Sequence, residues 1–453
     1  MEFFKLKQNH TTVKKEIVAG ITTFMTMAYI LAVNPDILSA AHMNKQGVFV
    51  ATIVAAILGT VLMGLCANYP FALAPGMGLN AFFAYTVVLK MGYSWQFALA
   101  AVFVEGLIFI LLTACNVREA LFNAIPKCMK YAVSAGIGLF IAFLGFQNAG
   151  VVVADGATYV TLGSMIAPQS VLCIVGVILT VILMKRHVKG AMLIGILGTW
   201  GLGIVAQLTG WYVVNPEIGQ YSLIPSFTSH GSLLAGFKEV AFKLPELSEI
   251  FGSVESILNF IIVVFCFLFV DLFDTLGTLM GVATKVGYLN EKGELPRIKQ
   301  AFFADAVATS VGALLGTSTV TTFVESTAGV MEGGRTGLTA ITTAICFAVA
   351  LFLSPIFLAI PSFATAPALI VVGVLMLDSI LEIDFTDMTE ALPAFLTMVM
   401  MPFTASIAEG IIFGGISYVV IKVFTGKRKD VSVMMYILAI LFTLKLMLTS
   451  VVH

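Results

Sequence analysis

The sequence predicts an all-α polytopic membrane protein, and three observations support this fold class. The 453-residue chain is 59% hydrophobic and only 11% charged, with a mean hydropathy of +1.02, whereas a soluble chain carries about 25% charged residues. Apolar runs of about 20 residues recur, as spanning helices require, instead of the short alternating segments of a β-barrel. With a cytoplasmic N-terminus, most Lys and Arg fall in cytoplasmic segments, and the few predicted outside are Lys45, Lys90, Lys238 and Lys243.

Hydropathy divides the chain into about 14 predicted spans, numbered here in chain order. They cover residues 16–38, 48–68, 71–90, 95–115, 127–147, 169–185, 190–209, 253–283, 298–315, 320–333, 336–358, 366–381, 391–404 and 406–424. A further apolar segment at 433–451 either crosses the membrane or lies at its interface, and the sequence leaves both open. The polar N-terminus lacks the apolar core of a signal peptide. We therefore expect a multi-pass plasma-membrane protein with a cytoplasmic N-terminus.

Spans 1 and 3 carry the first polar positions expected at membrane depth. In span 1, Thr26 lies midway along a long apolar run. In span 3, Pro75 and the glycines beside it interrupt the helix. Asn80 follows the interruption and offers both a donor and an acceptor. Phe82 could stack on a flat ring, although packing in the core is the commoner role of a single phenylalanine.

Span 8 contains FVDLFDTLGT, residues 269–278. Asp271 and Asp274 are three residues apart, so they share one face of a helix. Two carboxylates on one face inside lipid repel each other unless at least one binds a proton or a ligand. We expect at least one of them to contact substrate or carry a proton. The alternative is that one is a structural hydrogen-bonding group for the polar backbone opposite.

Span 10 lies within GTSTVTTFVESTAGVMEGGRTG, residues 316–337, which is too polar and too glycine-rich to face lipid. Non-helical backbone at membrane depth survives only inside protein or beside a wet cavity. We therefore expect an extended segment followed by a half-helix that begins near Glu325, Ser326 and Thr327. These residues suit a helix N-terminus, and such a terminus in a cavity is itself suited to a ligand.

The pattern of interruptions predicts two halves, about 1–209 and 250–424. Spans 1 and 8 are both long with polar midpoints, and spans 3 and 10 are both broken. Seven spans in each half force opposite membrane orientations, which is the inverted-repeat plan of secondary transporters.

Several function classes are excluded by what the sequence lacks. It has no Walker A lysine motif, HExxH or GxSxG, so nothing indicates an enzyme or a cofactor. The six cysteines are scattered without metal or disulfide spacing, so no metal site is expected. A net charge of −1 argues against nucleic acid as a partner. All histidines fall in predicted loops or termini, so a transported proton must use a carboxylate.

At these motifs the chain resembles a known family. APGMGLNAFF (74–83), FVDLFDTLGT (269–278) and VESTAGVMEGGRTGLT (324–339) are similar to the nucleobase–cation symporters, in particular the AzgA-like branch of adenine, guanine and hypoxanthine permeases. The resemblance extends nearly end to end and includes GITTFMTMAYILAVNP (20–35).

The resemblance implies a core domain and a gate domain, with spans 3 and 10 each formed by a short strand and a half-helix. The implied division is 1–115 and 251–360 for the core, 116–209 and 361–424 for the gate, 210–250 for an external connection, and 425–453 for a basic loop with the extra apolar segment. It also implies a homodimer formed through the gate domains, within the lipid bilayer.

The resemblance places the span 8 carboxylate at Asp271, the span 10 carboxylate at Glu325 and the span 3 amide at Asn80. Together with the residue patterns, it gives as substrate-binding candidates Asp271, Glu325, Asn80, Ser326, Thr327, Phe82 and Thr26, and as proton-coupling candidates Asp274, Asp271 and Glu325. The expected function is import of hypoxanthine, guanine or adenine by proton symport with an elevator-like motion. Sodium as the coupling ion stays open, and an anion permease of the same fold is the alternative.

Overall fold

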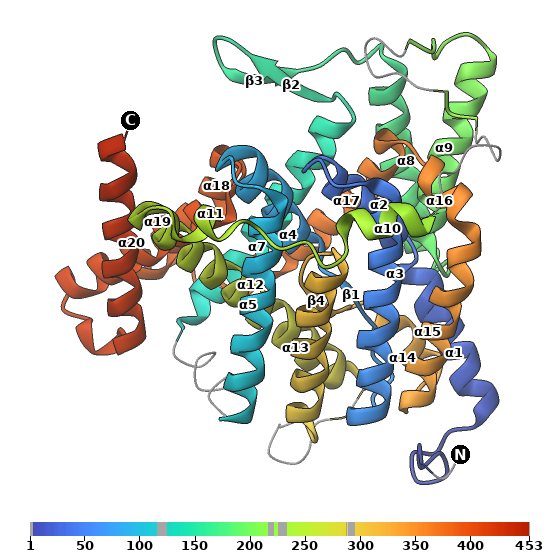
Figure 1. Cartoon of the computed structure of the whole chain (residues 1–453), viewed down its shortest axis with the longest axis horizontal. Helices are drawn as coiled ribbons and strands as arrows, with labels where there is room; N and C mark the ends of the chain where they lie inside the picture. Colours follow the sequence, from blue (N-terminus) through green and yellow to red (C-terminus); the bar gives the residue numbers. More distant parts are fainter. Residues whose placement is uncertain are drawn as a thin grey trace.

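The computed structural model describes residues 3–115, 125–215, 222–224, 233–286, 288 and 295–452. These residues form a helical protein with two small strand pairs (Figure 1). The helices are α1 (Val13–Met27), α2 (Ile30–Ser39), α3 (Lys45–Leu62), α4 (Met77–Ala81), α5 (Trp95–Ala114), α7 (Lys127–Asn148), α8 (Pro168–Lys185), α9 (Ala191–Leu208), α10 (Leu233–Val240), α11 (Leu247–Phe251), α12 (Val254–Val286), α13 (Ile298–Leu315), α14 (Ser326–Met331), α15 (Gly337–Ala350), α16 (Ser354–Ala359), α17 (Ser362–Met376), α18 (Met388–Thr404), α19 (Ile407–Phe424) and α20 (Val433–Val452). The strands are β1 (Leu73–Pro75), β2 (Val152–Asp155), β3 (Tyr159–Leu162) and β4 (Val320–Thr322).

The helix lengths confirm a polytopic membrane protein. Within the described ranges, 11 helical segments are long and apolar enough to cross a membrane. The other predicted spans are α18, which has 17 residues, and the two interrupted segments. The sequence leaves the place of α20 open. Among the α20 side chains that the structure describes, the exposed ones, which include Ile437, Ile440 and Leu444, are apolar, and this favours a membrane-embedded helix over an interfacial one.

Helix starts follow local capping chemistry. The side chains of Thr12, Asn44, Ser94 and Ser406 each accept a hydrogen bond from a backbone N–H in the first turn of the helix that follows. These residues are preferred N-caps because a short polar side chain satisfies a donor that has no partner within the helix. The starts of α1, α3, α5 and α19 are therefore determined by local sequence.

The spanning helices pack into two groups, which we call the first and second bundles. In the first bundle α13 packs on α3 and α5, α15 on α1 and α3, and α12 on α5. In the second bundle α7 packs on α17 and α18, α8 on α9 and α17, and α18 on α19. The segments α2 and α4 pack with the first bundle, as does the π-helix η2 (Phe82–Lys90).

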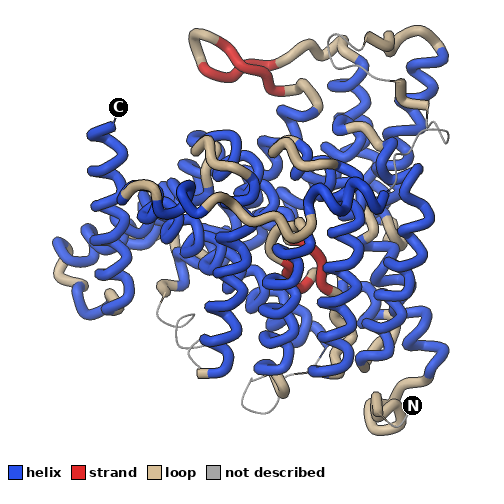
Figure 2. Tube along the Cα trace, in the orientation of Figure 1, coloured by secondary structure: helices blue, strands red, loops and turns tan. Residues whose placement is uncertain are grey.

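The two interrupted segments meet at the centre of the molecule, where Figure 2 shows a short strand pair enclosed by helices. β1 and β4 are antiparallel, with Leu73 opposite Thr322 and Pro75 opposite Val320. α4 follows β1 and α14 follows β4. The pair satisfies backbone groups that would otherwise be stranded away from water, since two broken helices supply each other's partners.

A buried carboxylate joins α1 to the start of α15. Glu16 is fully buried. It accepts hydrogen bonds from the backbone N–H groups of Arg335 (2.9 Å), Thr336 (3.3 Å) and Thr339 (3.1 Å), and from the Thr339 hydroxyl (2.6 Å). A negative charge at a helix N-terminus interacts favourably with the helix dipole. Glu16 therefore stabilises the contact between α1 and α15.

We expect Glu16→Ala to destabilise the protein by about 1–3 kcal/mol, because several buried N–H groups lose their acceptor. The melting temperature of the purified protein in detergent measures this loss. Glu382→Ala, at an exposed glutamate, is the control and should leave the melting temperature unchanged. An unchanged value for Glu16→Ala would show that water replaces the carboxylate without cost.

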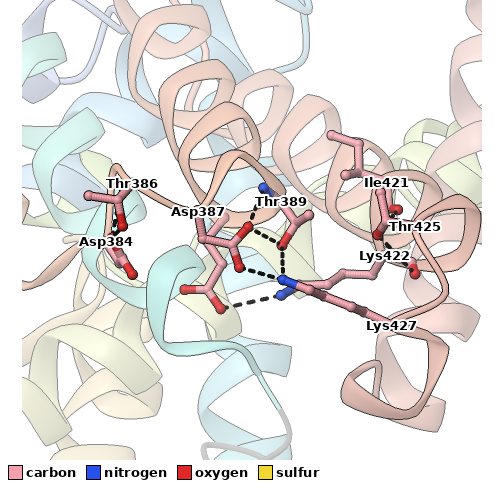
Figure 3. Close-up of polar contacts among 9 residues, drawn as sticks. Asp384, Thr386, Asp387, Thr389, Ile421, Lys422, Thr425 and Lys427 are labelled. Atoms are coloured by element: carbon pink, nitrogen blue, oxygen red, sulfur yellow. Dashed lines mark hydrogen bonds and ion pairs between the residues drawn. The ribbon is translucent and has the colours of Figure 1, made fainter.

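Ion pairs fasten α18 to α19 at the end of the second bundle shown in Figure 3. The Lys427 ammonium lies 2.7 Å from Asp387, and the Lys422 ammonium lies 3.4 Å from Glu390. Hydrogen bonds from Lys427 and Thr389 lower the pKa of Asp387, which also caps α18. The two helices are thereby linked at one end, where α18 begins and α19 ends.

Candidate functional site

The antiparallel pair of β1 and β4, which we call the strand crossing, is where the two interrupted segments meet. Asp274 of α12 lies against both segments there. A Cβ built at Gly76 would lie 2.9 Å from Thr321 Oγ1 and 3.3 Å from Asp274 Oδ2, so the Thr321 and Asp274 side chains both lie beside this glycine. Gly76 also donates its N–H to Thr319 O at 3.0 Å. Because a side chain at position 76 would fill this space, glycine allows the carboxylate to reach the crossing.

Glu325 lies at the start of α14 and is bound by a tyrosine from span 1. The Tyr29 hydroxyl donates to Glu325 Oε1 at 2.6 Å, and Thr26 Oγ1 lies 3.4 Å from the Glu325 carbonyl. Tyr29 follows the end of α1, where the chain turns into α2. Glu325 and Asp274 come from elements that pack together, since α14 contacts α12. The crossing therefore gathers two carboxylates and one phenol from three spans.

The hydroxyl groups of Ser326 and Thr327 both make hydrogen bonds to nearby backbone. Ser326 is buried, and its Oγ accepts the N–H of Ala72 at 3.0 Å, which ties α14 to the chain before β1. The Thr327 hydroxyl donates to Val324 O at 2.7 Å. The Ser326 hydroxyl hydrogen is still available as a donor, since the contact with Ala72 uses the oxygen as acceptor.

Asn80 and Phe82 lie beside the crossing and are both fully buried. Ser318 Oγ makes a very short hydrogen bond to Asn80 Oδ1, whereas Asn80 Nδ2 has no hydrogen-bond partner among the described residues. Phe82 packs edge-on against Phe267 at 4.9 Å between ring centroids. Asn80 thus presents a buried donor next to the crossing, and Phe82 is placed in the core between α4 and α12.

Asp271, which precedes Asp274 by three residues in α12, lies in a second cluster that is fully buried. Thr275 Oγ1 lies 2.9 Å from Asp271 Oδ1 and 3.0 Å from Asp305 Oδ1, and all three residues are buried. A threonine hydroxyl has one hydrogen and donates to only one of these oxygens. The other contact is favourable when the second carboxyl carries a proton and donates to the hydroxyl. This geometry suits a site that holds a proton.

Sequence reasoning missed several polar contacts of the site. Tyr29 and Thr321 contact the two carboxylates at the crossing, and Glu105, buried midway along α5, accepts from Thr319 at 2.8 Å. A usable signal for Tyr29 was its hydroxyl three residues after Thr26, on the same face of a helix. Glu105 had none, because one carboxylate in an apolar helix does not indicate which residue lies opposite.

The predicted residues fall into two sets by exposure. Asp274, Glu325, Thr26 and Thr327 keep part of their surface accessible, whereas the other predicted residues are buried: Asp271, Asn80, Ser326 and Phe82. A separate cavity of about 590 Å³ is lined by residues that include Tyr93, Trp95 and Glu249 and by none of the predicted site residues. Within the described ranges no cluster of His, Cys, Asp or Glu is suited to a metal ion.

Two crossed, interrupted segments inside a helical bundle define a membrane transporter fold. The transmembrane domain of the cyanobacterial bicarbonate transporter BicA has this fold: the match has a TM-score of 0.64 at 14% identity and covers 88% of this chain and 97% of that one.

The chain belongs to the Permease family, whose sequence pattern it matches over residues 14–413. It is 43% identical to the adenine permease AdeP of Escherichia coli, over 98% of this chain and 95% of that protein. It is also 43% identical to the guanine/hypoxanthine permease PbuO of Bacillus subtilis, over 98% and 99% of the two chains. Family membership confirms the resemblance found in the motifs and the prediction of a transporter instead of an enzyme.

Proposed function

We propose that this protein imports purine nucleobases across the plasma membrane, with its N-terminus in the cytoplasm. The observation that carries the proposal is the near full-length similarity to adenine and guanine/hypoxanthine permeases. The site chemistry agrees with it, because carboxylates at membrane depth accept the ring N–H groups that purines present on one flat edge.

In the proposed binding mode Glu325 accepts a purine N–H. Tyr29 donates to Glu325 Oε1 and so orients the carboxylate with Oε2 toward the substrate. The Ser326 hydroxyl and the amide of Asn80 supply donors for ring nitrogens or a carbonyl, and Thr26 and Thr327 complete the edge of the site. Phe82 acts through its packing on Phe267.

Proton symport is the proposed coupling. Asp274 takes up a proton with the substrate, because a neutral carboxylic acid costs less than an anion to enclose. Asp271 is the second candidate, through its contact with Thr275 and Asp305. Sodium remains the rival ion, since a pair of carboxylates also suits a cation.

We assign the first bundle to the predicted core and the second to the predicted gate. In the proposed mechanism they move against each other as an elevator, with the strand crossing carried by the core. A homodimer formed through the second bundle belongs to the same proposal. Cross-linking between two differently tagged copies in membranes tests the dimer, and recovery of one tag only would reject it.

Uptake of labelled hypoxanthine, guanine and adenine tests the function in cells that lack their own purine carriers. Accumulation that collapses with a protonophore is the expected result. Uptake that depends on sodium and survives the protonophore would reject the proton. No purine uptake by a well-expressed protein would reject the substrate class, and the anion permease reading, which is weakened by the acidic site, would then be tested with bicarbonate and sulfate.

We expect Asn80→Ala to change the ranking of the three purines, because they differ in the donors and acceptors that face a side-chain amide. Loss of one such hydrogen bond corresponds to about a tenfold change in affinity. Competition of each unlabelled purine against one labelled purine measures the ranking. Ser318→Ala, which removes the partner of Asn80 Oδ1, is the companion variant, and an unchanged ranking in Asn80→Ala would make Asn80 structural.

A further inference from the structure

Two charged side chains of the first bundle reach the ends of helices in the second bundle. Asp36 of α2 lies at the start of α17, and Lys90 at the end of η2 lies at the end of α18. In the proposed topology both contacts are on the external side, because spans 1 and 3 end there. We propose that these contacts form an external latch that holds the outside of the transporter closed.

The anionic half of the latch is built around Asp36. The Ser362 hydroxyl donates to Asp36 Oδ1 at 3.0 Å, and Thr365 Oγ1 lies 3.1 Å from Oδ2. Both residues are in the first turn of α17, where a negative charge interacts favourably with the helix dipole. Lys45, on the same bundle as Asp36, lies 3.1 Å from Oδ1 and holds the carboxylate in place.

The cationic half of the latch is built around Lys90. Its ammonium makes a very short hydrogen bond to the carbonyl of Thr404, the last residue of α18. Thr86, one turn earlier in η2, donates to Ala405 O at 3.1 Å. The last carbonyls of a helix have no partner within it, and a cation there interacts favourably with the dipole. Lys90 therefore supplies charge of the sign that this helix end attracts.

The two halves have opposite charges and meet opposite helix ends, so one relative position of the bundles satisfies both. A sliding movement of the first bundle would separate Asp36 from α17 and Lys90 from α18 together. The latch rests on the proposed movement of the core against the gate, but not on which substrate is carried. It gives the externally closed state a defined set of bonds that opening must break.

A cysteine reporter tests the latch on the full-length protein in membranes. Ile137 of α7 is the close neighbour of Gly78, since a Cβ built at Gly78 would lie 2.6 Å from Ile137 Cγ2. Ile141 is one turn further toward the external end on the same face and is 1% exposed. In a chain whose six native cysteines are replaced by serine, Ile141→Cys reports opening through its reaction with a membrane-impermeant maleimide added outside.

Asp36→Asn and Lys90→Met are each expected to raise the labelling rate about tenfold, because each loses a hydrogen bond made by a charged group. Ser362→Ala removes one of the two second-bundle partners of Asp36 and should act in the same direction. Lys243→Met is the matched control, since it removes the charge of an exposed lysine that is predicted on the external side but is not part of the latch, and it should leave the rate unchanged. Leu144→Cys, on the same face and 4% exposed, is a second reporter.

Rates in Asp36→Asn, Lys90→Met and Ser362→Ala that equal the rate in Lys243→Met would overturn the latch. Labelling needs no substrate, so its outcome is separate from that of the uptake experiment. A normal labelling response in a protein that carries no purine would reject the substrate and keep the latch. Purine uptake with an unresponsive reporter at both positions would reject the latch alone.

Discussion

Glu325→Gln is expected to abolish concentrative purine uptake while the protein remains folded and in the membrane. The substitution keeps the shape of the side chain but replaces a charged acceptor by an amide, which also presents a donor to the substrate's N–H. A hydrogen bond to a charged group is worth about 1.5–3 kcal/mol, so binding should weaken roughly tenfold to a hundredfold. Titration of the purified protein with hypoxanthine, guanine and adenine measures the loss directly.

The control for this variant is Glu332→Gln, the same substitution at the other end of α14. Glu332 pairs with Lys189 at 2.8 Å, and both side chains are substantially exposed. Exposed ion pairs contribute about 0–1 kcal/mol, so uptake should stay near the wild-type level. Tyr29→Phe should give an intermediate loss, because the carboxylate remains but is no longer oriented. Wild-type affinity in Glu325→Gln would remove Glu325 from the site.

Asp274→Asn is expected to separate binding from coupling. Asn keeps the size of the side chain and its place beside Gly76 and Thr321, but it cannot gain or lose a proton. The variant should still exchange labelled for unlabelled purine across the membrane, because exchange requires no net proton movement. Accumulation against a gradient, measured with an imposed pH difference in vesicles, should be lost.

The companion variant is Asp271→Asn, one turn away on the same helix. A normal response to the pH difference in Asp274→Asn, together with a lost response in Asp271→Asn, would assign the proton to the buried pair with Asp305. Loss of exchange as well as accumulation in Asp274→Asn would place that residue in substrate binding. Either result contradicts the role predicted here for Asp274.

The fold class was predictable because lipid imposes a simple rule on sequence. Every spanning helix must be long and apolar, so hydropathy alone located the spans. The same rule singled out the polar stretch of residues 316–337 and the broken span around Pro75, since neither is compatible with a lipid-facing helix. Asp271, Asp274 and Glu325 were found for the same reason, as carboxylates are expensive at that depth.

The sequence by itself therefore determined the membrane class, the interrupted segments and the list of polar residues within them. Only the tertiary structure decided which of these residues lie at the strand crossing and which lie in the buried cluster. Asp274 reaches the crossing beside Gly76, whereas Asp271, three residues earlier, is buried with Thr275 and Asp305. Helical spacing places both on one face but does not reveal what that face meets. The contacts of Tyr29 with Glu325 and of Asp36 with Ser362 were likewise not predictable from the sequence. Each pair is separated by about 300 residues and is brought together only by packing.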